Sequence, residues 1–168
     1  MKLQLITLLA FLSVANVTAG TTDNPKKSSD MDTLALTQEW DKTFPKSGKV
    51  EHSKVTFVNR FGVTLAADMY VPKGMNGKWP AIAVSGPFGA VKEQVSGLYA
   101  QTLAERGFLT IAFDPSFTGE SGGMPRNVAS PDICTEDFSA AVDFLATNDR
   151  VDAELSLIHI SEPTRPRL

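Results

Sequence analysis

The stretch that most constrains the fold is residues 80–121, which read as strand, glycine turn, helix, strand and a second glycine turn. Residues 80–85 are a short apolar run typical of a strand buried on both faces, and residues 109–113 form a second such run. Apolar residues recur at helical spacing across residues 95–103, and Gly107 stands where a helix end is expected. Two buried strands joined by a helix predict a parallel, right-handed crossover, so the fold class is α/β.

The segments on either side of this unit add a hairpin and a second helix. Residues 55–58 and 63–71 are strand candidates, and the turn residues 59–62 between them predict an antiparallel hairpin. A serine-proline pair at positions 130–131 is typical of a helix start, and apolar residues then recur at helical spacing across residues 138–145. We expect this second helix to lead into a further strand.

The N-terminal residues differ in composition from the rest of the chain. Residues 1–19 combine a positive start at Lys2, an apolar run and small residues before Gly20, which is the pattern of a cleaved signal peptide. The alternative is a membrane anchor, but the run is shorter than the ~20 residues that a spanning helix needs. We therefore expect a periplasmic or secreted protein without a stable membrane anchor after cleavage. Residues 20–49 are polar and predict a flexible lead-in, with Trp40 and Phe44 as the candidates to dock it.

The C-terminal residues 155–168 resemble the conceptual translation of a sequencing adapter, a recurrent contaminant of assembled reads. The resemblance implies a non-native tail on a protein truncated at about Glu154. A natural C-terminal tail is the alternative.

Composition excludes some classes of function. The chain has 168 residues, of which 21% are charged, and a net charge of −3, with lysine and arginine scattered rather than clustered. This pattern gives no reason to expect a nucleic-acid partner. Cys134 is the only cysteine, so no disulfide can form within the chain, and its setting predicts a small core residue.

The ordered elements resemble the N-terminal half of an α/β-hydrolase, close to the dienelactone hydrolases and the X-Pro dipeptidyl-peptidase-like domains. Residues 86–94 look like the oxyanion turn of those proteins, and residues 117–126 look like the loop after their fourth strand. The resemblance implies a truncated α/β-hydrolase fold over residues 50–154. It further implies an exported serine or cysteine hydrolase that cleaves an ester, lactone or amide bond of a small molecule or peptide through an acyl-enzyme, without a cofactor.

The resemblance also points to one candidate for the oxyanion hole. In the family, one backbone donor comes from the turn after the third strand. Pro87 has no N–H, so Phe88 is the candidate donor, and Gly86 and Gly89 shape the turn. The alternative is that Phe88 only covers the sheet.

Residues 119–123 match the lettering G-x-S-x-G, but we do not interpret Ser121 as a nucleophile. A nucleophile elbow runs directly from strand into helix, whereas here a loop intervenes after the strand and Pro125 follows closely. We interpret Asp114, Gly119 and Ser121 as structural residues of this turn.

No other residue of the sequence is a credible catalytic group or metal ligand. His52 precedes the predicted hairpin, His159 lies in the adapter-like tail, and two distant histidines with one cysteine show no ligand spacing. Lys92 and Glu93 are interpreted as a solvated pair that starts a helix. Acidic residues at the start of the second helix are interpreted in the same way, as groups that suit the helix dipole; they are Asp132, Glu136 and Asp137.

Two expectations follow. The nucleophile would come after a strand beginning near Leu155, so the chain itself should be inactive, and without that strand residues 80–85 would be a bare apolar edge prone to aggregation. The competing hypothesis is a non-catalytic exported binding module that uses the half-sheet as it stands.

Overall fold

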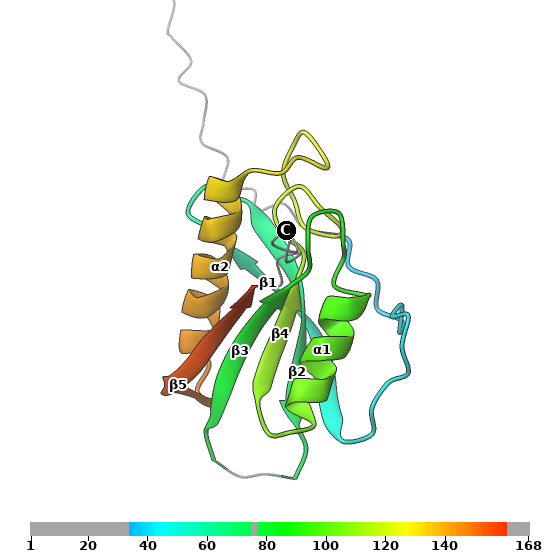
Figure 1. Ribbon diagram of the computed structural model, residues 1–168, viewed down its shortest axis with the longest axis vertical. Coiled ribbons are helices and arrows are strands. Elements are labelled where there is room, and N and C mark those ends of the chain that lie inside the picture. Colours follow the sequence, from blue (N-terminus) through cyan, green and yellow to red (C-terminus); the bar gives the residue numbers. More distant parts are fainter. Residues whose placement is uncertain (1–33, 75–76, 161–168) are drawn as a thin grey trace, which may run out of the picture.

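The computed structural model describes residues 34–74 and 77–160 (Figure 1). Their elements follow in the order β1 (Val50–Val58), β2 (Thr64–Pro72), β3 (Trp79–Ser85), α1 (Val95–Ala104), β4 (Leu109–Phe113), α2 (Pro131–Ala146) and β5 (Val151–Ile160). The predicted hairpin, crossover unit and second helix are all present, so the predicted α/β class is confirmed.

The five strands form one mixed sheet in the order β1-β2-β4-β3-β5. The β1–β2 and β2–β4 pairs are antiparallel, whereas β3 runs parallel to both β4 and β5. Helices α1 and α2 cover opposite faces (Figure 1), and each encloses its own apolar cluster against the sheet. This three-layer arrangement brings the carboxyl ends of β3 and β4 to the same edge.

The prediction of a bare edge at β3 is wrong. Strand β5 pairs in parallel with β3, with Trp79 opposite Val151 and Ser85 opposite Ile160. Residues 155–160, predicted to belong to a non-native tail, therefore form the second half of a strand that covers this edge. The origin of the tail sequence stays a prediction.

Helix α1 presents a different face to the sheet from the one its large apolar residues indicate. Val95 is 75% exposed and Leu98 44%, whereas the buried face carries small or polar residues, among them Gly97 and Ala100. Small residues let the helix approach closely: a Cβ on Gly97 would lie 2.2 Å from the Lys92 carbonyl oxygen and 3.1 Å from the Phe44 ring. Close approach, rather than hydrophobicity, decides the orientation of this helix.

Residues 34–49 are not the flexible lead-in that the sequence predicts. Phe44 is only 7% exposed, and the Trp40 indole N–H donates to its carbonyl oxygen at 2.8 Å. Polarity suggested a linker, but buried contacts hold the segment against α1 and the sheet.

The predicted signal peptide, residues 1–19, and residues 20–33 lie outside the described residues, so export stays a prediction. Within residues 34–74 and 77–160, no helix has the length and apolar character needed to cross a membrane.

Candidate active site

Two loops meet at the carboxyl ends of the parallel strands, where open α/β sheets bind their ligands. The first, residues 86–94, joins β3 to α1, and the second, residues 114–130, joins β4 to α2 (Figure 1). Both carry residues that the sequence singled out.

The first loop opens with a tight turn. The Ala90 N–H donates to the Pro87 carbonyl oxygen at 3.0 Å, and Gly89 has a φ of +83° at the third position of the turn. That combination is typical of a type II turn, for which glycine is preferred. Phe88 stands at the corner of the turn, and the residue is 71% exposed. Its N–H makes no hydrogen bond to any described residue, and its role as an oxyanion donor stays a prediction.

Asp114 joins the two loops. Its Oδ1 accepts the Lys92 backbone N–H at 2.8 Å, and its Oδ2 accepts the Lys92 ammonium at 2.9 Å and the Glu120 N–H at 3.0 Å. A Cβ on Gly119 would lie 2.2 Å from Oδ2, so only glycine fits beside the carboxylate. Asp114 thereby fixes the second loop to itself and to the first loop.

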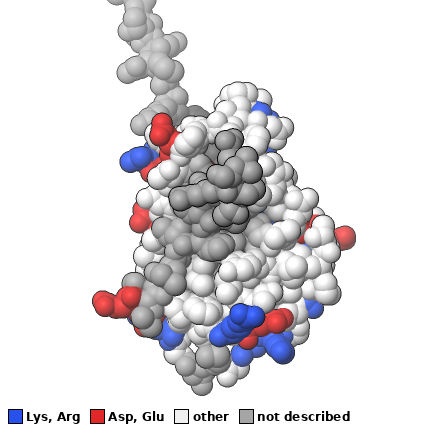
Figure 2. Space-filling model, viewed as in Figure 1, with Lys and Arg blue, Asp and Glu red and all other residues white. Residues whose placement is uncertain are grey.

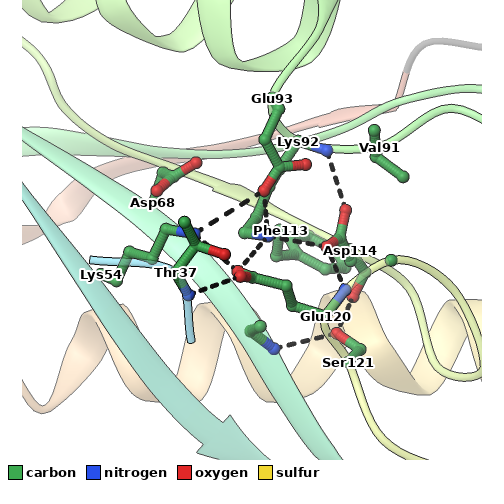
Figure 3. A network of polar contacts seen from close by, with 12 residues as sticks. Thr37, Lys54, Asp68, Val91, Lys92, Glu93, Phe113, Asp114, Glu120 and Ser121 are labelled. Atoms are coloured by element: carbon green, nitrogen blue, oxygen red, sulfur yellow. Dashed lines mark hydrogen bonds and ion pairs between the residues drawn. The ribbon is translucent and has the colours of Figure 1, made fainter. Parts of the chain in front are cut away.

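Lys92 and Glu93 do not form the solvated pair that the sequence predicts. Helix α1 starts only at Val95, and the Lys92 side chain is completely buried. Its ammonium is shared by Glu93, Asp114 and Glu120, the last at 2.8 Å (Figure 3). The sequence held only a weak sign of this arrangement: a lysine just before a helix opposes the helix dipole, but its acidic partners Asp114 and Glu120 are distant in sequence.

Opposite charges favour the ionised forms of Lys92 and Glu120. Burial opposes charge on Lys92, but Asp114 and hydrogen bonds from the ammonium to Glu120 and Glu93 raise its pKa above the ordinary lysine value. Burial also raises the pKa of Glu120, but hydrogen bonds from Lys54, Lys92 and the Thr37 N–H outweigh it and lower that pKa to about 2. These groups are held as ions and are not poised to exchange protons near neutral pH.

Three carboxylates of this cluster, those of Asp41, Glu93 and Glu120, have oxygens within 4.8 Å of one another. The ammonium groups of Lys54 and Lys92 lie among them, with Lys54 2.7 Å and Lys92 2.8 Å from Glu120. Lysines therefore supply the positive charge at this place.

Ser121 lies inside the second loop with both hydrogen-bonding functions in use. Its hydroxyl donates to the Asp114 carbonyl oxygen at 2.6 Å and accepts the Ala66 N–H at 2.9 Å, and the residue is 2% exposed. A nucleophile must be accessible and adjacent to a base, whereas Ser121 is buried and its hydroxyl bonds only backbone groups among the described residues.

A second buried carboxylate anchors the loop to α2. Asp137, in the second turn of the helix, accepts hydrogen bonds from the Ser116 N–H, the Ser116 hydroxyl and the Asn59 amide, each at 2.8 Å. Its side chain is buried, which raises its pKa. Glu136 pairs with Arg60 at 2.9 Å. The prediction that both acids serve the helix dipole is therefore wrong.

His52 lies within β1 rather than before it. Its Nε2 is 2.8 Å from Oδ1 of the buried Asp68, which also pairs with Lys42 at 3.0 Å. Tyr70 and Trp40 pack against its ring. These contacts make His52 part of the packing between β1, β2 and the N-terminal segment.

A pocket of about 380 Å³ lies beside β1, but it opens near the amino ends of the parallel strands. It is lined by Lys46, Val50, Glu51, His52, Ser53, Met69, Val71, Lys73 and Arg150. It is therefore separate from the two loops.

On the face seen in Figure 2, lysine and arginine side chains lie interspersed with aspartate and glutamate.

The sheet order, the parallel β3–α1–β4 crossover and the paired loops at its carboxyl edge define an α/β-hydrolase. The family model of the X-Pro dipeptidyl-peptidase (S15 family) matches residues 62–158. The chain belongs to this family, as the resemblance implied.

Known relatives agree with this assignment. An uncharacterized protein of Pseudomonas aeruginosa is 64% identical over 148 residues, covering 88% of this chain and 40% of that protein. The crystal structure of a hypothetical protein from Pseudomonas aeruginosa superposes with a TM-score of 0.73 at 71% identity, covering 74% of this chain and 39% of that one. A thiohydrolase of Aspergillus aculeatus is 36% identical and covers 61% of this chain and 31% of its own length. The chain thus spans less than half the length of these relatives.

Proposed function

We propose that this chain is the N-terminal part of an exported α/β-hydrolase that cleaves an ester, thioester, lactone or amide bond through an acyl-enzyme. The observation that carries the proposal is the turn at Phe88. This turn lies at the carboxyl end of β3, and the Phe88 N–H donates no hydrogen bond to a described residue. Hydrogen bonds from Lys92 to Asp114 hold the same loop against the loop after β4. Membership of a hydrolase family and similarity to a thiohydrolase support the reaction class.

The turn would supply one donor to the oxyanion of a tetrahedral intermediate. Such a donor must be held in place before the reaction, because its benefit depends on not having to reorganise. The hydrogen bond from Ala90 to Pro87 shapes the turn, and the Lys92–Asp114 contacts fix its far end. On this proposal, the described residues would supply one of the donors of an oxyanion hole.

The nucleophile, acid and base would come from sequence that follows β5 in the complete protein. No glycine follows Gly123 in this sequence, so it contains no G-x-S-x-G after β5. We therefore propose that the 168-residue chain has no hydrolase activity.

A direct test is to read the genomic DNA past the codon for Glu154 and to express residues 20–154 with the continuing frame, here called the extended protein. We expect a later G-x-S-x-G or G-x-C-x-G, followed by an acid and a histidine. The extended protein should hydrolyse a small activated ester or thioester, whereas the 168-residue chain should not. A natural stop codon after the present tail would contradict the proposal.

A non-catalytic exported binding module is the second candidate. The observation in its favour is that β5 pairs with β3, so residues 80–85 are not the open edge of the sheet and, among the described strands, that position falls to β5. A natural stop after the tail together with a stable monomer would favour this candidate.

For export, the test is the N-terminus of the mature protein. We expect a periplasmic or secreted form that begins near Gly20. A cytoplasmic protein that retains Met1 would contradict it.

A further inference from the structure

The N-terminal segment 37–44 reaches both loops of the candidate site. The Thr37 N–H donates to Oε1 of Glu120 at 2.8 Å, which holds the loop after β4. The Thr43 N–H and hydroxyl donate to the Glu93 carbonyl oxygen at 3.0 and 3.3 Å, which hold the loop after β3. One short segment therefore contacts both of the loops that Asp114 connects to each other.

An ionic chain continues these contacts into the site (Figure 3). The Lys54 ammonium of β1 lies 2.9 Å from Oδ2 of Asp41 in the segment and 2.7 Å from Oε2 of Glu120. The same Glu120 oxygen lies 2.8 Å from the Lys92 ammonium. Lys54 is 6% exposed, so its charge is little screened by solvent. Lys54 thus connects the segment to Glu120 and, through Glu120, to Lys92.

Close packing adds a second connection. The Phe44 ring lies against Gly97 of α1, and Gly97 in turn touches the backbone of Lys92, because a Cβ at position 97 would meet both. A displacement of the segment would therefore reach Lys92 through van der Waals contact as well as through charge.

We propose that segment 37–44 is a strap that positions the Phe88 turn, with Lys54 as its principal positioning residue. The proposal rests on the proposed function of that turn. The strap and Lys54 lie outside residues 62–158, the part that the family model matches. They contact the two loops at the place where, on this proposal, precise alignment of a donor determines the rate.

The first test uses the 168-residue chain and amide hydrogen exchange followed by NMR. The Ala90 amide reports the turn and the Lys92 amide reports the Asp114 clamp, since each is a donor in those contacts. We expect Lys54→Met to accelerate exchange of both amides at least about tenfold, with smaller changes in the β2–β4 pairing. Lys54→Arg, which keeps the charge, should remain near the parent.

Two results would overturn the strap. The first is an increase of less than about tenfold in the exchange rates of the Ala90 and Lys92 amides. The second is an equal increase in exchange rate throughout the sheet, which would indicate a merely structural role. If Lys54→Met does not fold, Asp41→Asn, at a partly exposed position, replaces it with the same criteria.

The second test uses the extended protein. Lys54→Met should lower kcat at least about tenfold by misplacing the donor, with KM nearly unchanged. Lys54→Arg, which keeps the charge, should have a kcat close to that of the extended parent. Unchanged kcat would overturn the strap. An extended parent that hydrolyses nothing would defeat the proposed function instead, and hydrogen exchange would still decide for or against the strap.

Discussion

The Nζ atom of Lys92 lies 2.9 Å from Oδ2 of Asp114, and neither side chain has solvent-exposed surface. The pair connects the ends of two parallel strands through their loops, one of which carries the Phe88 turn. Burying an ion pair costs desolvation free energy, but removing one partner costs more, because the other charge is then left buried and uncompensated.

Lys92→Met should therefore strongly destabilise the chain. It would leave Asp114 and its neighbours Glu93 and Glu120 without their shared cation, at a cost of about 3–5 kcal/mol of unfolding free energy. Urea denaturation followed by circular dichroism measures it. Lys78→Met, at an exposed position, is the control and should change stability by less than about 0.5 kcal/mol. Equal stabilities of the two variants would contradict the buried-pair account.

Stability should fall in acid. Although burial alone would raise both values, hydrogen bonds from lysines lower the pKa of Asp41 and of Glu120 to about 2 from ordinary values of 3.8 and 4.5. The stabilisation is thus present above about pH 5 and is lost as the pH falls towards 2. Asp137 acts in the opposite direction, because burial raises its pKa and protonation relieves that penalty.

Thermal unfolding at neutral and acidic pH measures this dependence. Glu120→Gln should reduce the loss of Tm between about pH 7 and pH 3, because one of the depressed carboxylates is removed. Glu105→Gln, at an exposed helix end, is the control and should keep the parent's loss. An equal loss in Glu120→Gln and the parent would show that the cluster does not set the acid sensitivity.

Gly119→Ala should disrupt the β4 loop. The residue has a φ of +53°, which costs a side chain about 1–3 kcal/mol, and the new Cβ would lie 2.2 Å from Oδ2 of Asp114. Gly62→Ala is the matched control, because Gly62 also has a positive φ, +79°, but nothing lies within 4 Å of its Cβ position. Unfolding free energies compare the two. Similar unfolding free energies for the two variants would mean that the loop accommodates the new Cβ without loss of the contact to Asp114.

Ser121→Ala in the extended protein should leave turnover largely intact. The hydroxyl is committed to Asp114 and Ala66, so its loss should cost about 1–2 kcal/mol of stability and little activity. Steady-state kinetics with an activated ester checks this. A fall in kcat of about a thousandfold with the fold preserved would identify Ser121 as catalytic after all.

The sequence was informative wherever periodicity and turn chemistry act locally. Buried runs predicted β3 and β4, and the serine-proline pair predicted the start of α2 at Pro131. Hydrophobic periodicity did not predict the orientation of α1, because tight contact at Gly97 favours its small residues over Val95 and Leu98.

The ionic cluster could not be predicted from local pattern. Lys92 and Glu93 look like an exposed pair, and their burial depends on Asp114 and Glu120, which follow 22 and 28 residues after Lys92, and on Lys54 and Asp41 far before it. By contrast, Trp40 and Phe44 stand out in the polar segment 34–49 as residues that could dock it, and in the structure the Trp40 indole donates to the Phe44 carbonyl oxygen and Phe44 is buried.

If the Phe88 N–H stabilises an oxyanion, removing that N–H alone should slow the reaction, and a pair of substitutions at Phe88 separates the N–H from the ring. Phe88→Pro removes the N–H at a turn position that suits proline, whereas Phe88→Ala keeps the N–H and removes only the ring. In the extended protein we predict that Phe88→Pro lowers kcat by about 10²–10³, the cost of one oxyanion donor, while Phe88→Ala retains kcat within about tenfold. Equal kcat values for the two variants would contradict the account.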